Sequence, residues 1–179
     1  SSTLAYQSEQ TFIAAGVPFF YPRSIHDIIP MGLQAFALSR LAGCCVGMKI
    51  VVDTADASSI IDLDQIRPEI AASDKSGPVH IGRHDPALLR EDRLFNLRLP
   101  AVSRFQTAQN IHSVIASQPA NGKLGIMTVG KTTCEVNYAL ASLGIDDPAK
   151  AGIGLFSVVM PWPVNPASLV EFAKYYDEV

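Results

Sequence analysis

The first part of the chain alternates short apolar runs with a longer amphipathic stretch. Val17–Tyr21 is a short apolar run, which predicts a strand. Between Met31 and Leu41, apolar residues recur at helical spacing. Cys44–Val52 is apolar almost throughout, which is typical of a parallel strand covered on both faces. The pattern between Gly16 and Asp53 therefore predicts a strand–helix–strand unit of an α/β fold.

A second alternation of the same kind occupies the C-terminal part of the chain. Leu124–Val129 predicts a buried strand, and residues 132–143 carry a helical pattern capped by Thr132 or Thr133. Ile153–Val159 predicts another buried strand, and Asn165 is placed to cap a last helix. We therefore expect a second α/β unit between Lys123 and Tyr176.

The segment between the two units has a different composition, rich in Ser, Asp, Pro and Gly from Thr54 to Asp85. It predicts an irregular connector with one short strand at Val79–Ile81. Two helical runs follow, Ala87–Asn96 and Ala101–Ala116, separated at Pro100. The sequence thus predicts an α/β protein of two small or incomplete parallel-sheet units joined by a linker. We expect the first domain to span residues 1–56, the linker with a short helix to span 57–100, and the second α/β domain to span 101–179.

Composition narrows the class of protein. Of the 179 residues, 48% are hydrophobic, which is enough for a sizeable core. No apolar run is long enough to span a membrane, and the net charge of −3 comes without a basic tract, so we expect neither membrane insertion nor nucleic-acid binding. The three cysteines lack a CxxC spacing, which favours a reducing, cytoplasmic setting. The chain begins with Ser1 and ends at Val179, where the α/β pattern predicts a further strand. We therefore expect the chain to be a fragment.

One stretch matches the letters of a nucleotide-binding phosphate loop. Gly125 is followed by four residues and then by Gly130, Lys131 and Thr132. The four intervening residues are mostly apolar and β-branched, as in a strand and not in a loop that wraps phosphate, so we favour a strand and a tight turn. A weaker hypothesis stays open, in which Gly130, Lys131 and Thr132 contact an anion at the helix N-terminus.

Other candidate groups are isolated in the sequence. The segment HIGRHD, residues 80–85, has metal-ligand spacing for a helix, but Gly82 and Pro86 disfavour a helix there. Cys44–Cys45 lies in a predicted buried strand and is expected in the core. Cys134 falls in the first turn of a predicted helix, where the dipole favours a thiolate, although no base accompanies it. Asp53–Asp56 follows a predicted strand, a usual place for site residues in α/β folds.

Several segments together resemble a known enzyme family. The runs SSTLAYQSEQ, GVPFFYP and ALSRLAGCCVGMKIVVDT resemble the latter part of the pyrimidine-binding domain of indolepyruvate:ferredoxin oxidoreductases, which belong to the thiamine diphosphate-dependent 2-oxoacid:ferredoxin oxidoreductases. HIGRHDPALLREDRLFNLRLPA is similar to the linker of that family. KLGIMTVGKTTCEVNYALASLGI and GLFSVVMPWPVNPASLVEFA are similar to its transketolase C-terminal-like domain. The resemblance covers essentially the whole chain in the same order.

The resemblance implies a function for a longer parent enzyme. That enzyme would oxidatively decarboxylate an aryl or other 2-oxoacid to its acyl-CoA, with thiamine diphosphate and Mg²⁺ as cofactors and iron–sulfur clusters that pass electrons to ferredoxin. The segments that carry the family's activating glutamate, Mg²⁺ motif and cluster cysteines are not matched in these residues. We therefore expect no catalytic residue, metal or cofactor in this fragment, and no activity from it alone. The resemblance implies only that Ser2, Thr3 and Glu9 lie near the cofactor.

An alternative of a different class stays open, in which the chain is a non-catalytic α/β module for assembly or dimerisation. In both cases the expected partners are proteins: the remaining domains or subunits of the parent enzyme, ferredoxin, and a second copy of the chain in a homo-oligomer. The small-molecule partners implied by the resemblance are the 2-oxoacid and coenzyme A.

Overall fold

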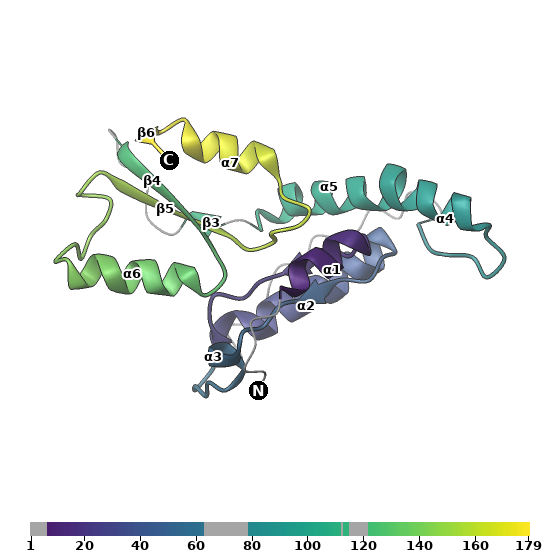
Figure 1. The fold of residues 1–179 in the computed structure, drawn as a ribbon, viewed down its shortest axis with the longest axis horizontal. Helices are drawn as coiled ribbons and strands as arrows, with labels where there is room; N and C mark the ends of the chain where they lie inside the picture. The colour runs from purple at the N-terminus through teal and green to yellow at the C-terminus, as the bar shows by residue number, and fades with distance from the viewer. Residues whose placement is uncertain (1–6, 63–78, 112, 115–121) are drawn as a thin grey trace.

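Two small sheets and the helices packed on them make up the fold (Figure 1). The computed structural model describes residues 7–62, 79–111, 113–114 and 122–179. One sheet has two parallel strands, and the other has four strands of which three are parallel. The predicted fold class, α/β with two small parallel-sheet units, is confirmed.

The first unit is the strand–helix–strand unit expected from the sequence. Its elements in chain order are α1 (Ser8–Ala14), β1 (Phe19–Phe20), α2 (Ile25–Ala42), β2 (Gly47–Met48) and α3 (Val52–Ala55). The two strands pair in parallel, with Phe19 opposite Gly47. The connecting helix α2 ends at Gly43, whose φ of 66° is left-handed and costs glycine little.

The second strand of this unit is much shorter than the pattern over Cys44–Val52 predicts. Pairing with β1 is confined to Gly47–Met48, and Val52 already begins the helix α3. Ile50 is exposed, so the prediction of a long strand covered on both faces is wrong. Cys44, Val46 and Met48 of the apolar run pack against the shared core, whereas Ile50 and Val52 beyond them are exposed.

One continuous helical run connects the two units, and the prediction of two separate helices is wrong. The run consists of α4 (Ala87–Arg93), the π-helical turn η2 (Leu94–Arg98) and α5 (Leu99–Gln109). Pro100 lies at the start of α5, directly after the π-helical turn. A proline leaves the carbonyl of the preceding turn without its usual donor, and a π-helical turn rearranges the hydrogen bonds at that point. The helix therefore continues through the proline.

Two further predictions around this run are corrected. The helix expected over Ala101–Ala116 ends at Gln109, because Asn110 adopts a left-handed φ of 46°, which asparagine tolerates well. Val79–Ile81 does not form a strand. Instead the Val79 carbonyl accepts a hydrogen bond from Nε of Arg98 at 2.7 Å, which ties the connector to η2.

The second unit contains the predicted strands and helices and two further strands, β3 and β6. Its elements are β3 (Ser113–Val114), β4 (Gly122–Val129), α6 (Thr132–Ser142), β5 (Ile153–Val158), α7 (Pro166–Ala173) and β6 (Tyr176–Glu178), and the strand order is β3-β5-β4-β6. β4 pairs in parallel with β5 and β6, while β3 pairs antiparallel to β5. The predicted cap of α7 is confirmed, since Oδ1 of Asn165 accepts from the N–H of Ala167 at 3.1 Å.

A shared hydrophobic core joins the two units. It contains Phe20 of β1, Leu38 of α2, Val102 of α5 and Met160 of the segment after β5, each fully buried. Backbone hydrogen bonds run alongside this core, from the N–H of Phe19 to the carbonyl of Trp162 at 3.0 Å and from the N–H of Tyr21 to the carbonyl of Val159 at 2.9 Å. The first sheet is thus attached to the exit of β5.

A second hydrophobic cluster lies within the C-terminal unit and contains tilted aromatic ring pairs. Phe172 of α7 is fully buried between Phe156 of β5 and Tyr176 of β6, with ring centroids 5.1 and 4.7 Å apart. Aromatic side chains of this kind bury large areas and prefer tilted pairings. Phe172 therefore fastens α7 to the four-stranded sheet.

Removing this ring should destabilise the protein markedly. We expect Phe172→Ala to lower the free energy of unfolding by about 3–5 kcal/mol, because the cavity lies at the centre of the aromatic cluster. The measurement is urea unfolding followed by circular dichroism. Val170→Ala, an exposed position on the same helix, is the matched control and should change stability by about 0.5 kcal/mol or less. Equal effects of the two substitutions would contradict the assigned packing.

Candidate functional site

The carboxyl ends of the parallel strands β1, β2 and β4 meet where the two units join. Tyr21 follows β1, Lys49 follows β2 and Gly130 follows β4. In Figure 1 the beginning of α6 lies beside α3 and the start of α2. Ligands of open α/β sheets bind at this end of the strands. We call the cluster formed by Glu9, Tyr21, Lys49, Asp53, Lys131 and Glu135 the junction site.

The turn between β4 and α6 is the sequence-predicted candidate for anion binding. Gly130 has a left-handed φ of 56°, and a Cβ on it would clash with the ring of Tyr21. Only glycine allows the ring to approach so closely in that conformation. The predicted caps Thr132 and Thr133 are corrected: Lys131 occupies the N-cap position, and the Thr132 hydroxyl donates back to the Val129 carbonyl at 2.7 Å. The phosphate-loop letters up to Val129 lie in β4, as favoured from the sequence.

Two carboxylates surround the ammonium group of Lys131. Nζ forms an ion pair with Asp53, which lies in α3 of the other unit, and a second one with Glu135 at 3.0 Å. The hydrogen bond to Asp53, and then that to Glu135, raises the pKa of Lys131. An anion at Gly130, Lys131 and Thr132 would have to compete with these carboxylates. The anion contact stays a prediction, and the observed role of Lys131 is to connect the units.

Glu9, expected near the cofactor, occupies the same end of the first sheet. Its carboxylate forms an ion pair with Nζ of Lys49, which also lies 4.8 Å from the centroid of the Tyr21 ring. Burial opposes the charged form, but the hydrogen bond and charge of Lys49 together with a backbone hydrogen bond outweigh it, so the pKa of Glu9 is lowered. Ser2 and Thr3 lie outside the described residues. The structure therefore joins Glu9 to the junction site without assigning it a ligand.

An adjacent ion pair fixes the entry to α2. Nε and Nη2 of Arg23 donate to the carboxylate of Asp27 at 2.7 and 2.8 Å, and the backbone N–H of Arg23 donates at 2.9 Å. Burial raises the pKa of Asp27, but these hydrogen bonds outweigh burial and the pKa is lowered. The Arg23 carbonyl accepts from Sγ of Cys134 in the first turn of α6, at 3.6 Å. This thiol therefore makes a contact between the units.

The charges of this region offset one another. Lys49 is paired with Glu9, Lys131 with Asp53 and Glu135, and Arg23 with Asp27 in the neighbouring turn. Within the described ranges, no three His, Cys, Asp or Glu side chains gather as a metal site. The Lys131–Asp53 pair links the second unit to the first, so the arrangement suits positioning of the two units.

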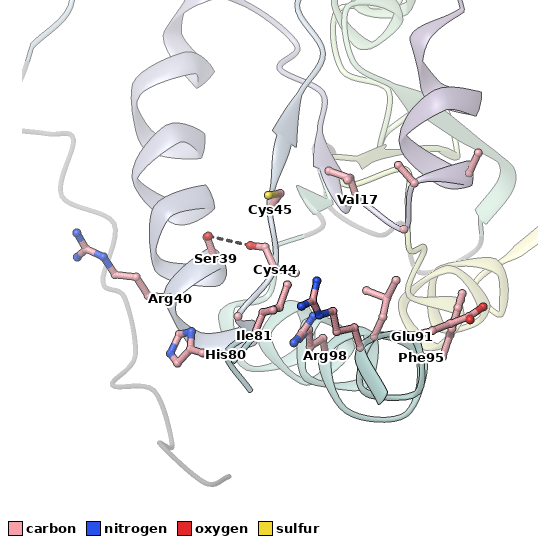
Figure 2. A pocket seen from close by; sticks show the side chains of 16 residues that line it. Val17, Ser39, Arg40, Cys44, Cys45, His80, Ile81, Glu91, Phe95 and Arg98 are labelled. Carbon is pink, nitrogen blue, oxygen red and sulfur yellow. Dashed lines mark hydrogen bonds between the residues drawn. The ribbon is translucent and has the colours of Figure 1, made fainter. Parts of the chain in front are cut away.

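A pocket of about 700 Å³ lies at the opposite, amino ends of β1 and β2 (Figure 2). It is bounded by the ends of α1 and α2, by the segment before β2, and by α4 and η2. Cys44 and Cys45 line it, with Cys45 exposed and Cys44 partly buried. Burial, together with the neighbouring Cys45, raises the pKa of Cys44 to about 11. The charge of Arg98 acts in the opposite direction but is the weaker effect. Cys44 is thus a protonated thiol at neutral pH.

Sequence reasoning found part of the junction site and missed part of it. It selected Asp53, Glu9 and the turn at Lys131, each at the end of a predicted element, and the structure brings all three together. It missed Tyr21 and Lys49 as members of the cluster. Lys49 had a usable signal, since it is the charged residue within the apolar run of β2 and its flanks.

A family comparison relates the C-terminal part of the chain to an oxidoreductase family. The model described as "Indolepyruvate oxidoreductase domain" matches residues 113–179, which span β3 to β6. The match covers the last 67 of the 179 residues, and over that part it confirms the resemblance predicted from the sequence. No curated protein matches the chain significantly. In the parts of the chain that the structure describes, no helix is long and apolar enough to cross a bilayer.

The Arg23–Asp27 pair predicts a pH dependence of stability. Because the pKa of Asp27 is lowered on folding, the pair stabilises the protein above the ordinary pKa of 3.8. That contribution is lost as the pH falls from 3.8 through the lowered value. We expect Asp27→Asn to reduce the free energy of unfolding by about 1–3 kcal/mol at pH 7, and the difference from the unmodified chain to shrink below pH 3.8.

Urea unfolding between pH 7 and pH 2.5 measures this difference. Asp146→Asn is the matched control, because it removes an exposed carboxylate and should leave stability nearly unchanged at pH 7. A difference for Asp27→Asn that stays constant down to pH 2.5 would show that the carboxylate is not stabilised in the fold.

Proposed function

We propose that the chain is part of a thiamine diphosphate-dependent 2-oxoacid:ferredoxin oxidoreductase. The enzyme would convert an aryl or other 2-oxoacid, with coenzyme A, to the acyl-CoA and pass the electrons to ferredoxin in the cytoplasm. The observation that carries the proposal is the indolepyruvate oxidoreductase match over residues 113–179. The likeness of the upstream segments, from SSTLAYQSEQ to VVDT, extends it to the first unit.

The proposal gives each unit a place in the parent enzyme. Residues 1–56 would end the pyrimidine-binding-like domain, residues 57–100 would be the linker, and residues 101–179 would form the transketolase C-terminal-like domain. The helical run from Ala87 to Gln109 passes from the linker into the last domain. The junction site would then fix these domains against each other and support one wall of the cofactor site, with Ser2, Thr3 and Glu9 nearest to it.

The cofactors of the parent enzyme are proposed to bind to its other parts. An iron–sulfur cluster takes several cysteine ligands, but Cys44 and Cys45 line the pocket of the first unit whereas Cys134 begins α6. These residues do not fit a cluster. Oε1 of Glu9 is paired with Lys49, while Oε2 is buried without a hydrogen-bond partner among the described residues. We therefore assign thiamine diphosphate with Mg²⁺, the clusters and the sites for coenzyme A and ferredoxin to the remaining domains or subunits.

The proposal is tested on the complete product of the reading frame that encodes these residues. We expect it to reduce ferredoxin under anaerobic conditions when an arylpyruvate and coenzyme A are added. We expect Gly130→Ala to lower that rate roughly tenfold or more, because the added Cβ strains the turn and displaces Tyr21 from the junction site. Gly32→Ala, where a Cβ meets open space, is the matched control and should retain the rate.

The results of these experiments test the enzymatic function and the role of the junction site separately. No reduction of ferredoxin with any 2-oxoacid, or a reading frame confined to residues 1–179, would contradict the enzymatic function. Full activity of Gly130→Ala would contradict only the role of the junction site. In titration calorimetry, the 179-residue chain alone is expected to bind no thiamine diphosphate with Mg²⁺.

A non-catalytic role in assembly is the second candidate function. Ile29, Leu33 and Phe36 lie on one face of α2 at helical spacing and are all exposed, Phe36 by 69%. The sequence predicted this stretch as a covered apolar face, and the structure corrects that for Leu33 and Phe36. We propose that the chain forms a homo-oligomer in which this face meets a second copy.

Light scattering coupled to size-exclusion chromatography tests the homo-oligomer. The chain should elute as a dimer or larger species at about 100 µM, and Phe36→Glu should shift it to the monomer, because a charge on the covered face must be desolvated. Tyr138→Glu, on the exposed side of α6, is the control and should not change the mass. A monomer at every concentration would contradict the proposal.

A further inference from the structure

The pocket at the amino ends of β1 and β2 contains a cation that the junction site does not use. Arg98 of η2 lines this pocket and is only 3% exposed. Its Nε donates to the Val79 carbonyl at 2.7 Å, whereas Nη2 is buried and has no hydrogen-bond partner among the residues that the structure describes. In Figure 2 Arg98 extends from its helix toward the segment Cys44–Cys45.

A buried guanidinium group with an unpaired N–H is costly. A buried donor left unsatisfied loses the hydrogen bonds that it makes to water in the unfolded chain, and this loss is larger when the donor is charged. Such groups in folded proteins are paired with an anion or held by carbonyl oxygens. The unpaired Nη2 of Arg98 therefore points to a partner that the described chain does not provide.

The helix ends around the pocket do not supply that partner. The carbonyls of Phe12 and Ile13 at the end of α1 accept the N–H groups of Val17 and Gly16 at 2.9 and 3.0 Å. At the end of α2, the carbonyl of Ser39 accepts the N–H of Gly43 at 2.9 Å. The Cys44 carbonyl accepts from the Ser39 hydroxyl at 2.8 Å. Each of these four carbonyls thus already accepts one hydrogen bond from the chain.

The remaining charges of the pocket also favour an anion. Arg90 and Arg98 line it, and Glu91 is the acidic residue of the lining, while Arg40 extends its guanidinium group away from Cys44 and Arg98 in Figure 2. Positive charge is therefore in excess over negative charge around the cavity. Opposite-charge attraction at such a site strengthens with burial, and Arg98 is the buried member of the set.

The apolar walls of the pocket indicate that the anionic group belongs to an organic molecule. Ile81, Leu94, Phe95 and Val17 contribute apolar surface, and Ile81 and Phe95 are exposed to solvent in the present form. A cavity of a few hundred Å³ with mostly apolar walls and a few polar anchors is typical of sites for small organic molecules. A planar guanidinium edge suits a carboxylate.

We propose that this pocket binds a small organic carboxylate. The carboxylate accepts a hydrogen bond from Nη2 of Arg98, and the apolar body of the ligand covers Leu94 and Phe95. The site lies at the end of the first sheet opposite the junction site, so it is separate from the proposed catalytic function and does not depend on it.

The test uses benzoate as the probe and benzamide as its neutral counterpart. Ligand-observed NMR titration of the 179-residue chain should give saturable benzoate binding at least tenfold tighter than benzamide binding, because only benzoate carries the charge. Arg98→Met should abolish the preference for benzoate. Arg104→Gln, which removes an exposed arginine of α5 outside the pocket, is the matched control and should retain it.

A second variant keeps the proposal testable where Arg98→Met fails to fold. Ala15→Phe places a ring in the pocket from an exposed position and leaves Arg98 intact, so it should weaken benzoate binding at least tenfold without changing the melting temperature by more than a few degrees. Equal affinity for benzoate and benzamide, no binding of benzoate, or unchanged binding in Ala15→Phe would each overturn the proposal.

Discussion

The attachment of β1 to the segment that follows β5 is the constraint on which the rest of the structure depends. A two-stranded sheet cannot bury enough apolar surface to be stable alone. Hydrogen bonds from Phe19 and Tyr21 to Trp162 and Val159 extend that sheet, and Phe20 enters a core that also contains Met160. Helix α5 closes this core from the side, so the connector helix is a structural part of both units.

The same attachment creates the junction site. Once β1 lies against the exit of β5, the carboxyl ends of β1, β2 and β4 face each other, and their charged neighbours must be paired. Lys131 reaches Asp53 across the boundary, and Lys49 holds Glu9 beside Tyr21. Ion pairs that are partly exposed contribute little stability one by one. The Lys131–Asp53 pair links the two units, which suits the positioning role proposed for the junction site.

The proposed functions use the two ends of the first sheet differently. The carboxyl end is closed by paired charges and the Tyr21 ring on Gly130, which suits a positioning contact. The amino end is open, with apolar walls and the unpaired Nη2 of Arg98, which suits a ligand. Ligands of α/β sheets usually bind at the carboxyl ends of the strands. In this protein the contact between the two units occupies those ends, and the open pocket lies at the amino ends of β1 and β2.

Local patterns by themselves determined the strand–turn–helix at Leu124–Ser142, the strand at Ile153, the cap at Asn165 and the family relationship, because each depends on residues close in sequence. They also indicated that the phosphate-loop letters are a strand. Only the tertiary structure decided that Cys44–Val52 pairs over two residues, that the helix continues through Pro100, and that Arg98 is buried. These outcomes depend on which surface is available to cover a segment, and that surface comes from residues distant in the chain.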